Sequence, residues 1–421
     1  MRAALIGPVP PHFGGQTPGG VATHQLHLAQ GLAAVGVETA LLATNTRVCR
    51  GQWGPEPQAA PLTLYRMPGS VRFDRQTVAA LGGYPCLGRY SLAVARSRQH
   101  GSRREVLRNV LTYRRFLAKV RPDVIHVQHP LERCLYARTV RRVEGWRTPL
   151  VVTAHSLFGE HEDATVRSLM APNLRAADRV IAVSEHIADQ AISLGVEERR
   201  VRVIRSGVDT EQFRPASASD RGDARLRLDI APDAPLVLFV GNLEPRKQVD
   251  VLLRAVARLR EPLPGVSLLI VGSGESAGPL DQSAYLARLT QDLRLDAAVR
   301  FVGRVTNDQL RDAYAAADVF ALPSSSEAQG IVALEAMACG LLVVASRVGG
   351  LLGTIDDEQS GFLVPAGDVA ALATRLAEVL GQPALRAAVG DAARRAVETR
   401  FAWPQAVAAT CQVYREVAGC Q

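Results

Sequence analysis

The sequence predicts an α/β fold of two doubly wound domains that face one another across a cleft. The chain has 421 residues, which suits two domains of roughly 200 residues, each with its own core. Short β-branched runs alternate with longer helical patterns, which is typical of βαβ units and parallel sheets. Apolar residues make up 47% and charged residues 21% of the chain, a globular composition without low-complexity segments.

The expected strands are short apolar runs bounded by turn residues. In the first half they occupy residues 3–7, 39–44, 62–67, 123–127, 150–154, 179–183 and 201–204. In the second half they occupy residues 236–240, 267–271, 299–302, 319–322, 342–345 and 361–364. After Asp368 the pattern is helical almost to the end, with one break at residues 400–404 before a last amphipathic helix. Each half therefore supplies the strands of one parallel sheet.

The domain boundary is expected where this alternation is lost. Residues 214–235 are rich in Pro, Ala, Ser and Asp, so they are predicted to be a linker. The domains then span residues 1–213 and 236–400, and the helix over residues 404–421 is expected to pack back on the first domain. Ligands of open parallel sheets bind at the carboxyl ends of the strands, so the cleft between the two domains is the candidate site.

The composition predicts a chain without a membrane span or a disulfide framework. The apolar run at residues 1–7 is shorter than a signal peptide needs, and no apolar stretch reaches the roughly 18 residues of a membrane span. We therefore expect a cytoplasmic protein. Six cysteines without C-x-x-C spacing favour reduced thiols over disulfides or zinc: Cys49, Cys86, Cys134, Cys339, Cys411 and Cys420.

Positive charge gathers in the first half of the chain. The formal net charge is +8, and between Arg89 and Arg147 fifteen basic residues stand against four acids. Such a region can attract anionic lipid headgroups or phosphorylated acceptors, which leaves contact with the inner face of a membrane as an alternative. A solvated pair of arginine-rich helices is the favoured interpretation. No aromatic interleaving or nucleic-acid motif accompanies the charge, so nucleic acid is not expected as a partner.

One motif gives the most specific indication of function. In the segment 323–340, Glu327 and Glu335 are separated by seven residues, and this pattern resembles the E-x7-E motif of the retaining glycosyltransferases of family 4. The resemblance implies the GT-B fold, with an N-terminal Rossmann-like domain for the acceptor and a C-terminal one for a nucleotide-sugar donor. Further segments that resemble the family occur in family order: residues 19–20, 153–155, 206–209, 241–247, 272–274, 317–319 and 348–350.

The two glutamates also suit a sugar nucleotide on chemical grounds. A carboxylate accepts paired hydrogen bonds from vicinal hydroxyls, which hexoses and riboses both present. The backbone N–H groups at the helix start, from Gly330, Ile331 and Val332, are donors suited to a phosphate. The resemblance implies that Glu327 holds the transferred hexose and Glu335 the ribose. The alternative is that these acids only favour a helix N-terminus.

A positive charge is needed where a sugar leaves a diphosphate. The resemblance identifies Lys247 as the diphosphate-binding lysine, and only Lys119 and Lys247 are lysines among the 49 basic residues. The family usually has arginine where this chain has Asn242, and Asn242 is expected to contact the donor at that place. Arg246 is an alternative partner for the diphosphate, as is a divalent ion, although no Asp-x-Asp pair stands at a matching place. Neighbouring side chains on a loop usually point apart, which argues against a shared role for Arg246 and Lys247.

Glycine loops and a histidine complete the predicted site. Gly19 and Gly20 precede an amphipathic helix over residues 21–35, so their amides are expected near the phosphate; a simple tight turn is the alternative. His155 follows a strand, and the matching histidine of the family touches the donor hexose. Gly272, in a segment that resembles the family, is also expected to contact the donor. It begins a Gly-Ser-Gly segment that lacks the third glycine of a dinucleotide fingerprint, which argues against a nicotinamide cofactor.

No metal site is predicted. His24 and His27 are three residues apart, and Glu160-His161-Glu162 is locally metal-like, but no further ligand has zinc spacing.

These observations predict retaining transfer of a hexose from a nucleotide diphosphate sugar, with a UDP-sugar favoured, to an acceptor hydroxyl. His155, Lys247 and Glu327 are the expected catalytic residues, and no cofactor is required. Ala328 and Gln329 replace the residues usual after the first glutamate, so the hexose stays open. A noncatalytic sugar-nucleotide-binding subunit, an epimerase and a phosphorylase-like enzyme remain alternatives. The acceptor is a small molecule, a lipid-linked molecule or a polysaccharide.

Overall fold

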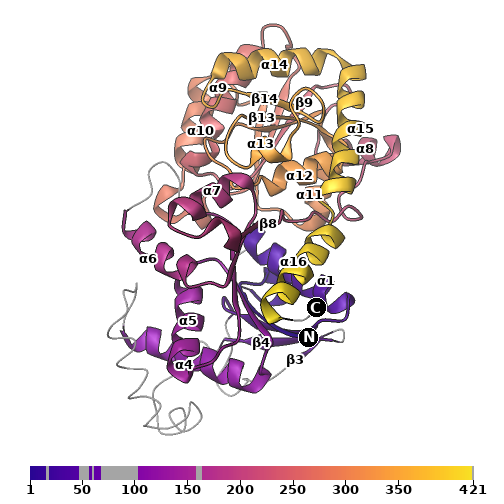
Figure 1. Ribbon diagram of the computed structural model, residues 1–421. Helices are drawn as coiled ribbons and strands as arrows, with labels where there is room; N and C mark the ends of the chain where they lie inside the picture. The colour runs from indigo at the N-terminus through magenta and orange to yellow at the C-terminus, as the bar shows by residue number, and fades with distance from the viewer. Residues whose placement is uncertain (16–18, 47–55, 59–60, 68–102, 158–163, 420–421) are drawn as a thin grey trace. The chain divides into compact units, whose positions relative to one another are not determined.

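The computed structural model describes residues 1–15, 19–46, 56–58, 61–67, 103–157 and 164–419 (Figure 1). It divides the chain into two compact units, Met1–Arg205 with Trp403–Gln421, and Ser206–Ala402. No helix among the described residues is long and apolar enough to span a membrane. Several sequence predictions concern residues outside the described ranges: Cys49, Cys86, Cys420, residues 160–162 and the basic positions before residue 103.

The N-terminal unit contains an eight-stranded sheet with the order β3-β4-β2-β1-β5-β6-β7-β8. All neighbouring strands are parallel except β3 and β4. The strand β3 has two residues and was not predicted, because an edge strand this short has no apolar pattern. The strands are β1 (Arg2–Gly7), β2 (Glu38–Ala43), β3 (Glu56–Pro57), β4 (Leu62–Arg66), β5 (Val124–Gln128), β6 (Leu150–Ala154), β7 (Arg179–Ala182) and β8 (Val201–Val203).

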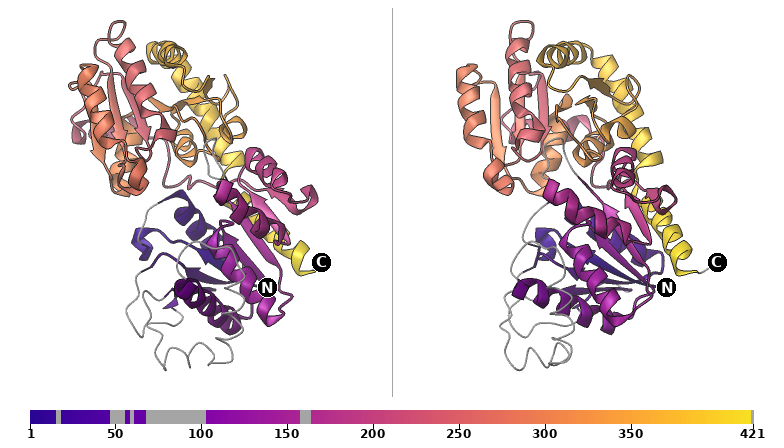
Figure 2. Two further views of the ribbon diagram at one scale, coloured as in Figure 1. Left: turned by 90° about the vertical axis from the view of Figure 1, so that its left-hand side faces the viewer. Right: turned by 60° about the vertical axis from the view of Figure 1, so that its left-hand side comes forward.

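The last helix of the chain, α16, belongs to this unit and packs against α1. A Cβ on Gly31 of α1 would stand 2.4 Å from a methyl group of Val407, so glycine permits the close approach. Val407 and Tyr414 of α16 lie in the same buried cluster as strand residues of this sheet, and both views of Figure 2 show α16 beside the sheet. The helices of the unit are α1 (Gly20–Ala34), α4 (Arg103–Val120), α5 (Glu132–Glu144), α6 (Ala164–Arg175), α7 (Glu185–Ser193) and α16 (Trp403–Ala418).

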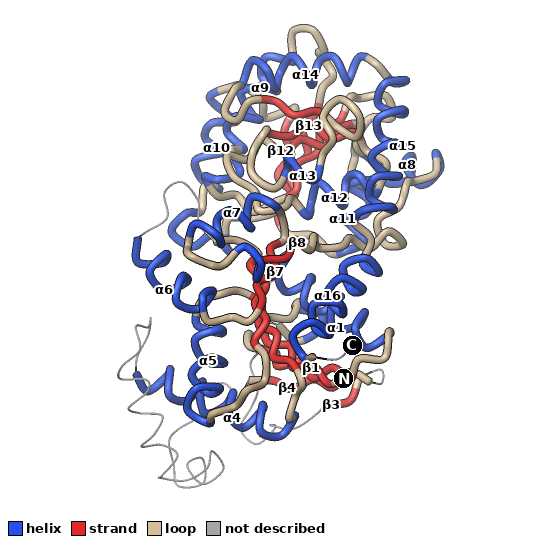
Figure 3. Tube along the Cα trace, viewed as in Figure 1, coloured by secondary structure: helices blue, strands red, loops and turns tan. Residues whose placement is uncertain are grey.

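The C-terminal unit contains a parallel six-stranded sheet with the order β11-β10-β9-β12-β13-β14. Figure 3 shows its strands gathered among the helices of the unit. The strands are β9 (Leu236–Val240), β10 (Ser267–Val271), β11 (Val299–Gly303), β12 (Val319–Leu322), β13 (Leu342–Ser346) and β14 (Phe362–Val364). The helices are α8 (Ala218–Arg227), α9 (Val249–Leu259), α10 (Ser283–Asp292), α11 (Asn307–Ala316), α12 (Ile331–Ala338), α13 (Leu351–Thr354), α14 (Val369–Gly381) and α15 (Pro383–Arg400).

The segment 214–235, which the sequence suggested as a linker, contains the helix α8 and lies inside the C-terminal unit. The helix begins with a capping box, in which the side chains of Ser217 and Asp220 each accept a hydrogen bond from the other's backbone N–H. The abundance of Ser, Asp and Ala that suggested a linker is the composition of a capped surface helix.

A buried ion pair fixes α8 to the sheet. Arg225 is 3% exposed, and its guanidinium lies 2.8 Å from Oδ2 of Asp318, the residue before β12. Arg221 pairs with the other carboxylate oxygen at 2.8 Å. The remaining donors of Arg225 are bound by backbone carbonyls of Ala231, Pro232, Ala234 and Ala316. The segment is thus part of the folded unit.

Both sheets reverse their strand order at one point. In the C-terminal unit the chain moves outward from β9 to β10 and β11, and then returns to place β12 on the other side of β9. In the N-terminal unit β1 and β5 have the same relation. Loops after such a strand pair diverge and leave a crevice at the carboxyl ends, which is where ligands of these sheets bind. The prediction of two doubly wound α/β sheets is confirmed.

Candidate functional site

The candidate site of the C-terminal unit is built on the loops that follow β9 and β12. The loop after β9 ends in a short 3-10 turn, Pro245–Lys247, and Gln248 then has a φ of 47° before α9 begins. This geometry turns Lys247 inward, and the residue is only 8% exposed. The loop after β12 carries Glu327, which is 7% exposed. The reversal of strand order thus brings together two charged residues that are 80 positions apart.

Lys247 and Glu327 form a buried ion pair. The ammonium of Lys247 donates a hydrogen bond to Oε1 of Glu327, and the Ser324 hydroxyl donates to the same oxygen at 2.9 Å. Burial alone would raise the pKa of Glu327, but the charges of Lys247 and Arg246 together with these hydrogen bonds hold it below its ordinary value. Glu327 is therefore a carboxylate at neutral pH.

Arg246 also reaches Glu327. Its Nη1 lies 3.5 Å from Oε2 of Glu327 and donates to the carbonyl of Ser326 at 3.1 Å. Arg246 and Lys247 do not point apart here, because they contact different oxygens of the same carboxylate, and a contact of Arg246 with the diphosphate stays a prediction. Asn242 is exposed on the same loop. Arg246 also pairs with Glu244 through Nη2 at 2.5 Å, so two cations and two carboxylates lie together at this strand end.

Glu335 lies on α12 beside a tyrosine that the sequence analysis did not identify. The hydroxyl of Tyr314 on α11 donates to Oε2 of Glu335 at 2.8 Å. Burial raises the pKa of Glu335 to about 7, and the hydrogen bond from Tyr314 only partly opposes this effect. Tyr314 is itself buried and 21 residues away in sequence, so no local pattern marks it. Glu335 is thus a carboxyl group that gains or loses its proton near neutral pH.

Two glycines, Gly330 and Gly350, determine the backbone geometry at the start of α12. Gly330 precedes the helix with a φ of 84°, a conformation that favours glycine. The N–H of Gly350 donates to the carbonyl of Glu327 at 2.8 Å, and a Cβ on Gly350 would stand 1.9 Å from the carbonyl oxygen of Ala328. The first N–H groups of the helix, from Ile331 and Val332, have no intrahelical acceptor, as at any helix start. They are available to an anion.

Gln329 has a structural role within this loop. Its side chain accepts a hydrogen bond from the N–H of Ser206 at 2.8 Å and donates to the carbonyl of Ser206 at 2.9 Å. It is 3% exposed. Gln329 thus fixes the first residue of the C-terminal unit, and the sequence alone offered no signal for this contact across 123 positions.

Gly272 is explained by packing. It has a φ of 134°, and a Cβ there would stand 1.9 Å from the carbonyl oxygen of Gly241. The loops after β9 and β10 therefore touch through their backbones. A direct contact of Gly272 with a ligand stays a prediction.

In the N-terminal unit, His155 lies at the carboxyl end of β6 and is 8% exposed. Its Nε2 lies 2.7 Å from Oε1 of Gln128, at the end of β5. An amide oxygen only accepts, so Nε2 of His155 carries the hydrogen and Nδ1 has a lone pair that can accept a hydrogen bond. Burial, followed by the neighbouring histidines led by His24, lowers the pKa of His155 well below its ordinary value. His155 is therefore a neutral imidazole with a defined tautomer.

A second buried histidine holds Gln128 in place. Nε2 of His126 lies 2.7 Å from the hydroxyl of Thr153 and 3.5 Å from Nε2 of Gln128. Nδ1 of His126 lies 2.7 Å from the hydroxyl of Tyr414 on α16. Burial lowers the pKa of His126 to about 3, so this ring is neutral too. The network joins the last helix of the chain to the orientation of His155.

Gly19 and Gly20 lie at the start of α1, with Gly19 before the helix and Gly20 as its first residue. His24 of this helix packs edge-on against the ring of His155, with 4.5 Å between ring centres. Among the described residues, no group of three or more metal-ligating side chains is placed to hold a metal ion.

Two protein-family descriptions match the chain. "Glycosyltransferase Family 4" matches residues 18–212, and "Glycosyl transferases group 1" matches residues 220–396.

Curated relatives and solved structures agree with these matches. A protein of Catenulispora acidiphila named D-inositol 3-phosphate glycosyltransferase 2 is 34% identical over 94% of this chain and 90% of its own length. A D-inositol 3-phosphate glycosyltransferase of Saccharomonospora viridis is 39% identical over 64% of this chain and 65% of its own length. Sucrose-phosphate synthase of Thermosynechococcus elongatus is 25% identical with a TM-score of 0.79 over both whole chains. Anabaena HepE, solved with UDP and glucose, is 19% identical with a TM-score of 0.75 over 99% of this chain and 100% of its own.

Proposed function

The chain belongs to glycosyltransferase family 4, and on this premise we propose that it transfers a hexose from a UDP-sugar to a hydroxyl of a phosphorylated polyol. As a member of this family it is a retaining glycosyltransferase that uses a nucleotide-sugar donor. The base of the donor and the nature of the acceptor are the proposed parts. The main support for a nucleotide-sugar site is the Lys247–Glu327 ion pair at the crevice between β9 and β12. Glu335 lies on α12, the helix that follows.

Lys247, Glu327 and Glu335 are each assigned a role in donor binding. Lys247 and the N–H groups at the start of α12 stabilise the negative charge that develops on the departing diphosphate. Glu335 accepts hydrogen bonds from the ribose hydroxyls, and Glu327 from hexose hydroxyls. His155, a neutral acceptor at Nδ1, is assigned to the hexose on the family resemblance. The uracil base is supported by HepE, which has the same fold and was solved with UDP and glucose.

The raised pKa of Glu335 gives donor binding a pH dependence. An unfolded glutamate loses its proton near pH 4.5, whereas Glu335 in the folded protein keeps it up to about pH 7. Its contribution to stability therefore falls as the pH rises from 4.5 to 7. Ribose hydroxyls donate to the ionised form, so donor binding below pH 7 must release this proton.

We expect the affinity for a UDP-sugar to rise about tenfold between pH 6 and pH 8, with most of the rise below pH 7, and then to level off. Isothermal calorimetry on the wild type and on Glu335→Gln measures it. The variant should bind more weakly, and its affinity should not change over this pH range. A wild-type affinity that is independent of pH from 6 to 8 would contradict the assignment of Glu335.

The acceptor is inferred from a cation at the carboxyl ends of the N-terminal strands. Arg133 lies in the first turn of α5, directly after β5, and its Nε donates to the hydroxyl of Thr44 at 2.9 Å. Nη1 and Nη2 of Arg133 make no hydrogen bond with a described residue. Burial and then the charge of Arg133 lower the pKa of His129 to about 4. A half-buried guanidinium with free donors suits a phosphate, and curated relatives are named for inositol 3-phosphate.

The replacement Arg133→Gln is expected to raise the KM for inositol 3-phosphate about ten- to a hundredfold, the effect of losing a charge-assisted contact. The affinity for the UDP-sugar should stay unchanged. Arg142→Gln, an exposed arginine on the same helix, is the matched control. Unphosphorylated inositol distinguishes a phosphate contact from a structural defect. A structural defect would raise the KM for inositol and for inositol 3-phosphate to the same degree.

The transfer reaction tests the function as a whole. Purified protein is incubated with UDP-glucose and inositol 3-phosphate, and the glycosidic product is identified by NMR. The proposal expects a product with the anomeric configuration of the donor. Release of sugar phosphate on addition of phosphate would indicate a phosphorylase instead, and donor binding without transfer to any acceptor would indicate a noncatalytic subunit.

A further inference from the structure

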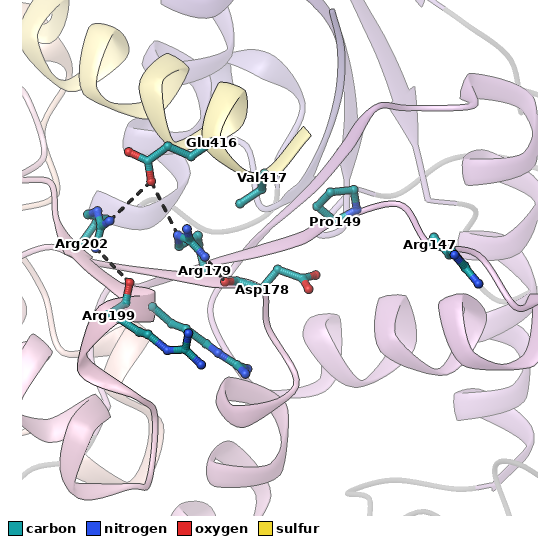
Figure 4. A pocket seen from close by; sticks show the side chains of 9 residues that line it. Arg147, Pro149, Asp178, Arg179, Arg199, Arg202, Glu416 and Val417 are labelled. Carbon is teal, nitrogen blue, oxygen red and sulfur yellow. Dashed lines mark hydrogen bonds and ion pairs between the residues drawn. The ribbon is translucent and has the colours of Figure 1, made fainter. Parts of the chain in front are cut away.

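The N-terminal unit has a concave site at the edge of its sheet opposite His155. A pocket of about 620 Å³ lies where β6, β7 and β8 begin and where α16 ends (Figure 4). His155 and Gln128 stand at the carboxyl ends of parallel strands in the same sheet, whereas this pocket is formed at the amino ends. Within this unit it is therefore separate from His155 and from Arg133, which follow the carboxyl ends of β6 and β5.

The pocket is strongly basic. Five guanidinium groups and two carboxylates line it, which gives the lining a formal net charge of +3. The arginines are Arg147, Arg179, Arg199, Arg200 and Arg202. Glu197, just outside the pocket, pairs with Arg199 at 2.6 Å and Arg200 at 2.7 Å. The positive charge of Arg147, Arg179 and Arg202 is the part that a ligand can use.

The carboxylate of Glu416 shows where the pocket attracts a negative charge. Oε2 of Glu416 lies 3.6 Å from Nε of Arg179 and 3.5 Å from Nη2 of Arg202, as the dashed lines in Figure 4 show. Charge-assisted hydrogen bonds are shorter, about 2.7–2.9 Å. The Nε of Arg179 is buried and makes no hydrogen bond within the part of the chain that the structure describes. Glu416 therefore lies between the two guanidinium groups but does not form a short hydrogen bond with either of them.

Backbone carbonyls hold these arginines in position without cancelling their charge. Nη1 of Arg202 donates to the carbonyls of Arg199 at 3.0 Å and Val201 at 3.1 Å. Nη1 of Arg179 donates to the carbonyl of Asp178 at 2.9 Å. The side chain of Arg147, across the pocket, has no ion pair with any described residue. Because neutral groups restrain the guanidiniums, an incoming anion does not have to order them.

We propose that this arginine pocket binds a small ligand that carries at least two phosphate groups. Planar guanidiniums match the oxygens of a phosphate in a two-point contact, and Arg147, Arg179 and Arg202 supply three of them, enough for more than one phosphate. The volume lies within the range of about 300–1,000 Å³ that small-molecule sites have. A free diphosphate compound and a lipid headgroup with two phosphates share this chemistry, so the experiment separates the two sources.

The test measures pyrophosphate binding to the full chain by isothermal calorimetry. The double variant Arg179→Gln/Arg202→Gln should lose at least about tenfold in affinity. The variant Glu416→Gln should bind pyrophosphate several-fold more tightly, because it removes the competing carboxylate. Lys247→Ala should retain this binding, which separates the pocket from the proposed donor site, and Arg142→Gln is the matched surface control.

Vesicles that contain cardiolipin distinguish a lipid headgroup with two phosphates from a free diphosphate ligand. Cosedimentation that depends on Arg179 and Arg202, and that pyrophosphate abolishes, would identify a lipid headgroup. Pyrophosphate binding without cosedimentation would identify a free ligand. The proposal is overturned if the double variant binds pyrophosphate like the wild type, or if Glu416→Gln only lowers the melting temperature. The latter is the behaviour of ion pairs that serve structure alone.

Discussion

Replacement of Lys247 by alanine is expected to lower turnover about 10²–10³-fold, the usual loss when one group that stabilises transition-state charge is removed. The ammonium is buried beside Glu327 and follows the central strand β9, where the departing diphosphate is proposed to lie. No other lysine can replace it, because the chain has only one more. Steady-state kinetics with saturating donor and acceptor measure the effect.

The variant also leaves Glu327 with Arg246 as its remaining cation, at 3.5 Å. Loss of one partner of a buried pair destabilises a fold, so turnover is compared at a temperature where a melting curve shows the variant folded. The double variant Lys247→Ala/Glu327→Gln removes the unpaired charge and should regain stability but not turnover. Lys119→Ala, on the exposed side of α4, is the control. If Lys247→Ala turns over within threefold of the wild type while folded, the role of Lys247 is wrong.

Replacement of Asp318 by alanine is expected to destabilise the C-terminal unit by about 3–5 kcal/mol, because it leaves the buried guanidinium of Arg225 without its carboxylate. The substitution also removes the acceptor for the N–H of Leu236, at the start of β9. Amide hydrogen exchange in residues of this unit measures the change without assuming that the whole chain unfolds in one step.

A matched control lies on the same pair of helices. Asp312 of α11 pairs with Arg227 of α8 at 2.6 Å, but this arginine is exposed. Asp312→Ala should therefore change exchange rates much less than Asp318→Ala. Equal effects of the two substitutions would show that the buried pair does not fix α8. A segment that acted only as a linker would tolerate both changes.

The sequence was sufficient to predict the parallel sheets, because strands buried on both faces are continuous apolar runs. The strand β9, for example, has five buried residues, Leu236–Val240, and its predicted limits match the structure. The helix α8 was missed because its Pro- and Ser-rich surroundings suggested a linker. The capping box between Ser217 and Asp220 was the local signal that could have identified it.

The candidate site was predictable only in part. Glu327, Glu335 and Lys247 belong to sequence motifs, and the strand order explains why Lys247 and Glu327 meet. Tyr314 and Gln128 belong to no motif, since each acts through one contact made by the tertiary fold. The protonation states were not predictable either. The pKa of Glu327 is lowered and that of Glu335 is raised because their partners and burial differ, and the spacing of two glutamates does not reveal this.

We propose that the C-terminal unit holds the diphosphate of a UDP-sugar through Lys247 and its ribose through Glu335. A thermal-stability screen of the full chain with UDP-, GDP-, ADP- and dTDP-sugars tests it most directly, because a ligand that binds only the folded state raises the melting temperature. The expected result is a rise in melting temperature with UDP-sugars that is smaller for Lys247→Ala and for Glu335→Gln than for the wild type. A melting temperature that no nucleotide sugar changes, or a rise that both variants keep in full, would contradict it.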